Sequence, residues 1–197
     1  MNDVTISKQL SYLLRHGATK AGLKMESDGY VNVVDILRQV KVSFVRLQQI
    51  VNTNDKQRFQ MIQKNNIWYI RANQGHSINT VVSEELLREV TNPTDIPLCI
   101  HGTYQKYLPS IMKNGLSRMS RNHIHFARGM FGDKNVTSGM RKDCDAFLRI
   151  NVDKCMKDGF KFYISNNNVI LSAGNDKGII TSEYFDVILD KNKIYTL

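Results

Sequence analysis

The spacing of apolar residues changes along this 197-residue chain, and the change predicts its architecture. In the first third, apolar side chains recur at the three- and four-residue spacing of amphipathic helices, and two strand-like runs follow. In the remainder, apolar residues gather in many short runs of strand length, with little helix between them. The sequence therefore predicts an α+β protein in which a helical part with a hairpin precedes a mostly antiparallel, split sheet.

The first part is predicted to contain three helices and a hairpin. A helix is expected over residues 5–15, a second over 33–37, and a third after Ser43, which has the residue type of an N-cap. The runs 59–62 and 67–70 flank a polar turn and predict a β-hairpin. Helices followed by a hairpin are typical of a winged-helix unit, which often binds nucleic acid, although a fold alone does not establish that use.

Residues 77–97 are polar and carry two of the three prolines, which indicates a connection between two domains. We place the domains at 1–92 and 93–197. The second domain is expected to hold one clear helix, Tyr107 to Asn114, ended by Gly115. Its strand candidates are residues 98–100, 124–126, 146–150, 162–164, 169–171 and 185–188.

Charge gives a first indication of the partner. The chain has 27 Lys and Arg against 18 Asp and Glu, a formal net charge of +9. Such an excess favours polyanions, nucleic acid above all, because binding releases condensed counterions. A basic surface kept for solubility is the alternative that charge alone leaves open.

Targeting patterns and cysteines indicate an intracellular protein, cytoplasmic or nuclear. No apolar run approaches the roughly 20 residues that span a bilayer, and the N-terminus lacks a signal-peptide pattern. The three cysteines are Cys99, Cys144 and Cys155. They are far apart and include no C-x-x-C pair, so neither a disulfide framework nor a zinc site is expected.

Three arginines and a histidine lie at the ends of predicted elements: Arg15, His16, Arg58 and Arg121. Arginine presents a rigid fork of donors that matches the oxygens of a phosphate, and it stays charged at physiological pH. A site with several of them would suit a phosphate monoester. Each also has a structural explanation, since cations near a helix C-terminus gain about 0.3–1 kcal/mol from the helix dipole. Composition alone does not choose between these explanations.

A second candidate site is His101-Gly102-Thr103, at the end of a predicted strand. Glycine allows a ligand to approach the backbone, while the His and Thr side chains offer hydrogen bonds. A turn with a capping threonine is the alternative. No carboxylate lies near His123 and His125 in sequence, so a metal site is not expected there. The chain also lacks the glycine-rich patterns of Rossmann and P-loop nucleotide sites.

Seven motifs in order resemble the NAD-dependent RNA 2′-phosphotransferases, the tRNA-splicing enzymes of eukaryotes and their bacterial and archaeal relatives. They cover nearly the whole chain, and a closing Tyr184-Phe185 pair is also similar. The motifs are Ser7-Lys8 through Leu13-Leu14-Arg15-His16, Asp28-Gly29-Tyr30, Asn54-Asp55-Lys56-Gln57-Arg58-Phe59, Gln74-Gly75-His76-Ser77, His101-Gly102-Thr103, Arg121-Asn122-His123-Ile124-His125 and Ser138-Gly139-Met140-Arg141.

The resemblance implies a winged-helix N-terminal lobe and a C-terminal lobe with the ADP-ribosyltransferase fold. It implies that an internal RNA 2′-phosphate, of the kind left at a tRNA splice junction, is transferred to NAD+ with release of nicotinamide. An ADP-ribosylated RNA 2′-phosphate is the implied intermediate, and the products are RNA with a free 2′-OH and ADP-ribose 1″,2″-cyclic phosphate. No metal is implied. A monomer is the default expectation for a chain of this size.

The family's functional residues carry over position by position. The catalytic set falls on Arg15, His16, Arg58 and Arg121, and His16 would orient the phosphate or move a proton. The residues expected to bind NAD+ are His101, Gly102, Thr103, His125, Ser138, Gly139, Arg141 and Val169.

Val169 stands where many protein-modifying relatives carry a glutamate that activates the acceptor. A valine fits an acceptor that is already an anion. The chain departs from many relatives at Asn167-Asn168, where they have Asn-Gly, which concerns loop geometry only.

Two other functions remain open from the sequence. One is an ADP-ribosyltransferase that modifies terminal phosphates of nucleic acids and stops there. The other is a non-catalytic, RNA-binding winged-helix module. The presence of Arg15, His16, Arg58 and Arg121 together speaks against the second, because binding alone does not require that set.

Overall fold

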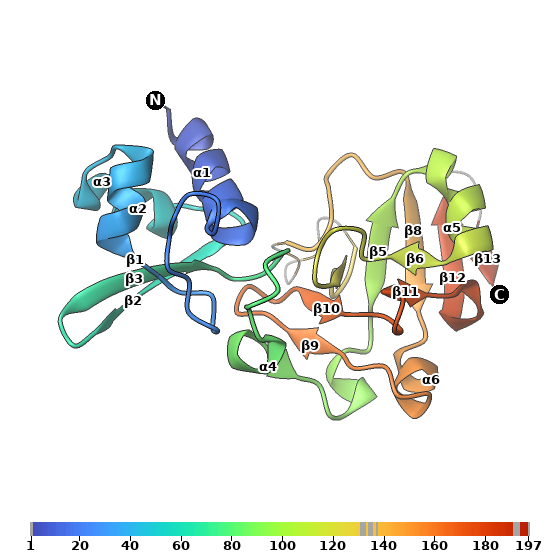
Figure 1. Ribbon diagram of the computed structural model, residues 1–197. Coiled ribbons are helices and arrows are strands. Elements are labelled where there is room, and N and C mark those ends of the chain that lie inside the picture. Colours follow the sequence, from blue (N-terminus) through green and yellow to red (C-terminus); the bar gives the residue numbers. More distant parts are fainter. Residues whose placement is uncertain (1, 131–132, 134–135, 137, 191–193, 197) are drawn as a thin grey trace. The chain divides into compact units, whose positions relative to one another are not determined.

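The computed structural model describes residues 2–130, 133, 136, 138–190 and 194–196, in two compact units that divide between Leu86 and Leu87 (Figure 1). Helices and antiparallel strands occur together, which confirms the predicted α+β class. The division falls before the predicted boundary at 92/93. The reason is that β4 (Arg88–Glu89) pairs with β9 (Tyr163–Ile164), and Val90 packs in the core of the second unit.

The first unit contains a small antiparallel sheet of order β1-β3-β2, with the helices α1, α2 and α3 beside it (Figure 1). Its elements are α1 (Asp3–Tyr12), a π-turn η1 (Leu13–Gly17), β1 (Val31–Asn32), α2 (Val33–Val40), α3 (Phe44–Asn52), β2 (Phe59–Lys64), β3 (Ile67–Ala72) and α4 (Ser83–Leu86). The predicted second and third helices and the hairpin are confirmed in position, with the hairpin register running from Phe59↔Ala72 to Lys64↔Ile67.

Side-chain caps explain where these helices begin. The Asn2 and Asn32 side chains accept the Thr5 and Val34 amides, and the Ser43 hydroxyl accepts the Arg46 amide at 3.3 Å, as predicted for an N-cap. The inward faces of the helices then pack with the sheet into one core. Its fully buried members are Leu10, Leu14, Ala18, Val31, Ile36, Val40, Leu47, Ile70 and Ala72.

The first helix differs from its prediction. Residues 5–15 were expected as one α-helix, but α1 ends at Tyr12 and the chain continues as a π-turn through Gly17. A π-turn contains one residue more than an α-helical turn, so Tyr12 and Gly17 approach each other. A Cβ atom at Gly17 would lie 2.5 Å from Cε1 of Tyr12, so the ring in this position lies over the space that the glycine leaves open.

The second unit contains two four-stranded antiparallel sheets, in the orders β4-β9-β10-β7 and β13-β12-β8-β5. A short pair, β6 (Leu116–Ser117) and β11 (Ile179–Ile180), lies apart from them. The remaining elements are β5 (Ile100–Thr103), α5 (Leu108–Asn114), β7 (Ile124–Phe126), β8 (Ala146–Ile150), α6 (Val152–Lys157), β10 (Ile170–Ser172), β12 (Phe185–Asp190) and β13 (Ile194–Thr196).

One bridge joins the two large sheets. Ile100, at the start of β5, exchanges two backbone hydrogen bonds of 3.0 and 2.8 Å with Ala127, which follows β7. The bridge brings β5 and β7 together, and these are the strands that carry the His101 and His125 motifs. Apolar side chains from both sheets, including the fully buried Phe126, Leu148, Phe162 and Ile170, form the core.

Several boundaries differ from the sequence prediction. The strand expected to end before His101 instead contains it, since β5 runs to Thr103 and pairs with β8 over all four residues. The stretch expected as a plain connection holds α4, β4 and a short helical turn at Pro93–Asp95. The helix ended by Gly115 is confirmed, with φ of +82° at the glycine, whereas α6 was not predicted.

Candidate active site

Arg15 and His16 lie on the π-turn of the first unit, and a segment after β3 supports both. The Ser77 amide donates to the Arg15 carbonyl at 2.9 Å, and the Ser77 hydroxyl lies 2.9 Å from Nδ1 of His16. Gly75 has φ of +90°, and a Cβ atom there would lie 3.4 Å from Cδ and Nε of Arg15. The guanidinium stem of Arg15 therefore runs directly along the glycine backbone.

Arg58 immediately precedes β2, and its own motif holds it. The Asn54 side-chain oxygen accepts from the Arg58 backbone amide at 3.0 Å and from its guanidinium at 3.2 Å. The Asp55 carboxylate forms an ion pair with the same guanidinium at 3.3 Å. The Arg58 side chain remains 29% exposed, so the ion pair leaves donors of the fork available to a ligand.

Asn73 supports Arg58 from the other side. Its backbone amide donates to the Arg58 carbonyl at 2.9 Å, and its side-chain amide donates to the Gln57 carbonyl at 2.6 Å. Gln57 has a left-handed backbone with φ of +44°, and the buried Asn73 holds that conformation in place. Residues 73–77 therefore hold Arg15, His16 and Arg58, three of the four predicted catalytic residues, through one continuous segment.

A polar groove of about 480 Å³ opens beside Arg58 in the first unit. Its acids are neutralised, because Asp3 pairs with Arg46 at 2.6 Å and Asp55 pairs with Arg58. Hydroxyl, amide and cationic groups line the groove over an apolar base. The lining residues are Asp3, Val4, Ser7, Lys8, Ser11, Ile50, Thr53, Asn54, Asp55 and Arg58.

Arg71, near the same segment, has a structural role instead. Its buried guanidinium donates to the Gln60 side chain and the Asp28 carbonyl, and it lies 4.5 Å from the centre of the Tyr30 ring. All of these partners belong to the fold of the first unit.

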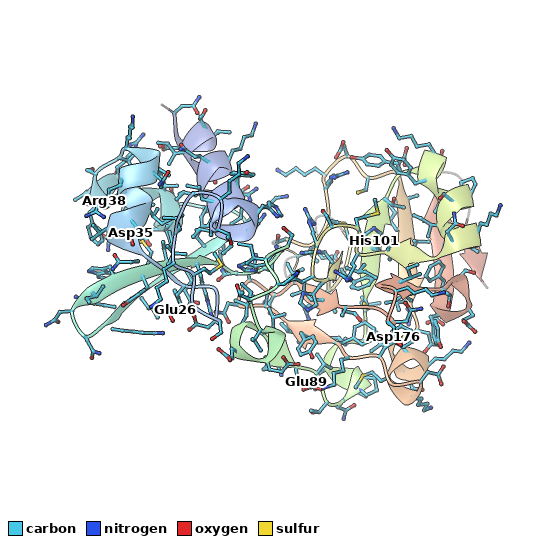
Figure 2. The ribbon with its side chains drawn as sticks, viewed as in Figure 1. Glu26, Asp35, Arg38, Glu89, His101 and Asp176 are labelled. Carbon is cyan, nitrogen blue, oxygen red and sulfur yellow. The ribbon has the colours of Figure 1, made fainter. Side chains whose placement is uncertain are left out.

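In the second unit, His101 is placed by the bridge between β5 and β7; Figure 2 labels it among the side chains. Its Nδ1 lies 2.9 Å from the His125 carbonyl. Burial lowers the pKa of His101, a shift that the His125 carbonyl partly opposes and the charge of Arg141 reinforces. The ring is therefore neutral at neutral pH. Because a carbonyl only accepts, Nδ1 carries the proton and Nε2 is left with its lone pair.

Gly102, the next residue, faces the segment that carries the other predicted cofactor residues. A Cβ atom at Gly102 would lie 2.9 Å from Sγ of Cys144 and 3.0 Å from Cβ of Met140. Gly139 has φ of +103°, and a Cβ there would lie 2.8 Å from the Phe126 carbonyl oxygen. The two glycines therefore let residues 138–144 pack closely on β5 and β7. Through this packing, the structure brings together His101, Gly102, His125, Gly139 and Arg141, while no contact among the described residues places Ser138 beyond its position next to Gly139.

Thr103 and Val169 contribute differently. Both are buried, Thr103 within β5 and Val169 directly before β10 with no exposed surface. The Thr103 carbonyl accepts the Asp145 amide, and the Val169 amide donates to the Ser165 hydroxyl. These two residues fix the backbone around the candidate site.

The charge of Arg141 acts on Arg121. Arg121 lies in the turn before β7, and its side chain is exposed to solvent. Partial burial of its guanidinium lowers the pKa of Arg121, and the like charge of Arg141 adds to this shift. A hydrogen bond with the Tyr104 hydroxyl raises the pKa of Arg141, whose guanidinium lies 5.8 Å from the Tyr104 ring centre. Because like charges repel, an anion bound near Arg121 and Arg141 would reduce the repulsion.

Sequence reasoning missed Asn73, Ser77 and Cys144 as supports of the site. Ser77 closes the Gln74-Gly75-His76-Ser77 motif and Asn73 precedes it, which was a usable signal, whereas nothing near Cys144 in the sequence points to Gly102. Within the described part of the chain, no three His, Cys, Asp or Glu side chains gather as metal ligands would. Among the same residues, no helix is both long and apolar enough to cross a membrane.

Comparison with known proteins identifies the class. Residues 1–174 match the family described as "RNA 2′-phosphotransferase, Tpt1 / KptA family". The chain is 46% identical to tRNA 2′-phosphotransferase 1 of Danio rerio over 190 residues, 93% of this chain and 84% of that protein. It is 38% identical to tRNA 2′-phosphotransferase of Saccharomyces cerevisiae over 182 residues, 87% of this chain and 79% of the relative.

A bacterial relative extends the similarity. The chain is 36% identical to "Probable RNA 2′-phosphotransferase" of Flavobacterium johnsoniae over 173 residues, 85% of this chain and 90% of that protein. A two-unit α+β protein with Arg58 held beside a polar groove thus falls within a class of phosphate-transferring enzymes. The chain belongs to the Tpt1/KptA family of RNA 2′-phosphotransferases.

Proposed function

We propose that this protein transfers an internal RNA 2′-phosphate to NAD+. We take the RNA to be tRNA with a splice-junction 2′-phosphate, in keeping with the names of its eukaryotic relatives. The observation that carries the proposal is the support of Arg15, His16 and Arg58 by the one segment 73–77. A structure that orders two arginines and a histidine in this way is suited to a phosphate with two negative charges.

The residues around His101 fit the ribose and pyrophosphate of NAD+. Neutral Nε2 of His101 is an acceptor for a ribose hydroxyl, and the backbone at Gly102 lacks a side chain that would fill the space. Arg141 supplies positive charge that suits a pyrophosphate. On this basis we propose an ADP-ribosyltransferase-like lobe for the second unit and a winged-helix, RNA-binding lobe for the first.

The proposed reaction has two balanced steps. An oxygen of the RNA 2′-phosphate attacks C1″ of the nicotinamide ribose, the bond to nicotinamide breaks, and nicotinamide leaves. The 2″-hydroxyl of the ADP-ribosylated RNA then attacks the phosphorus, and the bond to the RNA 2′-oxygen breaks. The products are RNA with a 2′-OH and ADP-ribose 1″,2″-cyclic phosphate.

Arg15, Arg58 and Arg121 are assigned to the phosphate in both steps. Holding the phosphate in line with C1″ gives the first step the advantage of a positioned reactant. In the second step the same forks stabilise charge on the equatorial phosphoryl oxygens. His16, oriented through Ser77, is assigned to orient the phosphate or to carry the proton that moves between the 2″-hydroxyl and the leaving 2′-oxygen.

The test is incubation of the protein with an RNA oligonucleotide that carries one internal 2′-phosphate, with and without NAD+. We expect loss of the phosphate only with NAD+, together with nicotinamide and the cyclic phosphate in equal amounts. Accumulation of ADP-ribosylated RNA would instead favour an enzyme that stops after the first step. Binding of the RNA without any reaction would overturn the enzymatic proposal.

A further inference from the structure

Tyr12 is an exposed aromatic side chain at the start of the turn that carries Arg15 and His16. It is the last residue of α1, and 52% of its surface is exposed. Its ring centre lies 6.4 Å from that of His16, with the two planes inclined by 50°. Isolated exposed apolar residues are ordinary on protein surfaces, so exposure alone does not indicate a function.

What distinguishes Tyr12 is that its ring lies against a glycine. The π-turn brings Gly17 under the ring, and the Cε1, Cδ1 and Cζ atoms occupy the space that a side chain at residue 17 would fill. The turn therefore presents a large, flat, partly apolar surface beside His16, with one face on the backbone of Gly17 and part of the ring open to a ligand.

The surroundings of the ring indicate a nucleic acid as the ligand. Lys8, one helical turn before Tyr12, lines the polar groove together with Ser7 and Ser11 of the same helix. A cation, two hydroxyl groups and an exposed ring along one helix match the charge, the sugar and the base of a nucleotide. The excess of basic residues over the whole chain favours the same kind of partner.

We propose that Tyr12 is a stacking platform for the base of a nucleotide that adjoins the 2′-phosphate of the RNA. The inference rests on the proposed function and deepens it, because it names a contact that selects a polynucleotide over an isolated phosphate. Every base has a π-face, so stacking tolerates any sequence at the junction. Selection of the reactive position is left to the arginines that hold the phosphate.

The first test measures binding without NAD+, so that it does not depend on turnover. RNA oligonucleotides with one internal 2′-phosphate carry 2-aminopurine on either its 5′ or its 3′ side, and fluorescence is followed on titration with protein. We expect quenching in one of the two, retained in Tyr12→Phe, and affinity about 5- to 100-fold lower with loss of quenching in Tyr12→Leu. Val45→Ala, which truncates an exposed side chain on α3, is the matched control and should bind like the original protein.

A second measurement keeps the inference falsifiable if Tyr12→Leu is poorly folded. An RNA with an abasic nucleotide at the quenched position should bind the unaltered protein less tightly by the same factor as the substitution. If neither Tyr12→Leu nor the abasic nucleotide lowers the affinity, the stacking role is overturned. If such a protein still removes the 2′-phosphate with NAD+, the proposed function stands and only the stacking inference fails.

Discussion

Ser77 and His16 lie 61 residues apart in the sequence, and the Ser77 hydroxyl is 2.9 Å from Nδ1 of the His16 ring. The same serine binds the Arg15 backbone, so one residue sets the position of two neighbouring candidate catalytic groups. His16 itself is exposed on the π-turn, and an exposed ring needs such a partner to keep one orientation.

We expect Ser77→Ala to lower kcat about 2- to 10-fold with little change in KM for RNA, because a neutral hydrogen bond contributes about 0.5–1.5 kcal/mol. Ser77→Thr keeps the hydroxyl and should recover most of the rate. Steady-state kinetics with a 2′-phosphorylated oligonucleotide would measure both. Equal rates for all three proteins would show that Ser77 does not orient His16.

Arg58→Ala and Arg121→Ala are each expected to lower turnover by more than about 100-fold while thermal unfolding changes little. Each substitution removes a charged fork that the proposed transition state requires. Arg58→Lys should not restore the rate, because an ammonium group lacks the paired donors of a guanidinium.

The matched control for both arginines is Arg38→Ala. Arg38 is an exposed arginine on α2 that pairs with Asp35, and both residues are labelled in Figure 2. Its removal should leave turnover unchanged. Near-normal rates in Arg58→Ala and Arg121→Ala would contradict the roles given to them.

Gly102→Ala is expected to weaken NAD+ binding at least about tenfold and to lower the melting temperature by a few degrees. The new methyl group would lie 2.9 Å from the Cys144 sulfur and 3.0 Å from the Met140 Cβ, so residues 140–144 must shift. Cys144→Ala alone should behave like the original protein, and the double variant should recover part of the loss. Calorimetric titration would measure the NAD+ affinity of each variant, and thermal melts would measure its stability. If Gly102→Ala changes neither, residue 102 is not closely packed against residues 140–144.

Acidification is expected to destabilise the second unit through His101. Burial holds the pKa of the folded His101 below its ordinary value near 6.5, so the unfolded chain takes up the proton first as pH falls. Stability should therefore decrease as pH drops from 6.5 towards the lower, folded pKa, and level off below it. In His101→Asn this part of the decrease should disappear. Denaturant unfolding of both proteins at several pH values between 7 and 5 would test the prediction, and parallel curves would refute it.

Local sequence patterns predicted those parts of the fold that local interactions determine. Ser43 caps α3 and Gly115 ends α5, and each of these relationships lies within one short stretch of sequence. By contrast, β4 contains two charged residues only, and α6 is a helix of six residues. Pairing with β9 stabilises β4, and Asn151 caps α6 at 2.9 Å, a signal available in the sequence but weak in isolation.

The candidate site could be predicted as a set of residues but not as an arrangement. The motifs name Arg15, His16 and Arg58, whereas their common support by residues 73–77 depends on how the chain returns after the hairpin. The contact of Gly102 with Cys144 is likewise a product of tertiary packing. The π-turn at residues 13–17 was not predicted, because the spacing of apolar residues hardly differs between an α-helical turn and a turn with one extra residue.

That extra residue has a consequence for how the site tolerates insertions and deletions. Removal of Leu14, which precedes Arg15 and His16, would return the turn to α-helical geometry and rotate these two residues by about 100° relative to the preceding helix. Arg15 and His16 would then point away from Ser77, although every side chain of the set would still be present. In this protein the count of residues in one helical turn constrains catalysis as strictly as their identity.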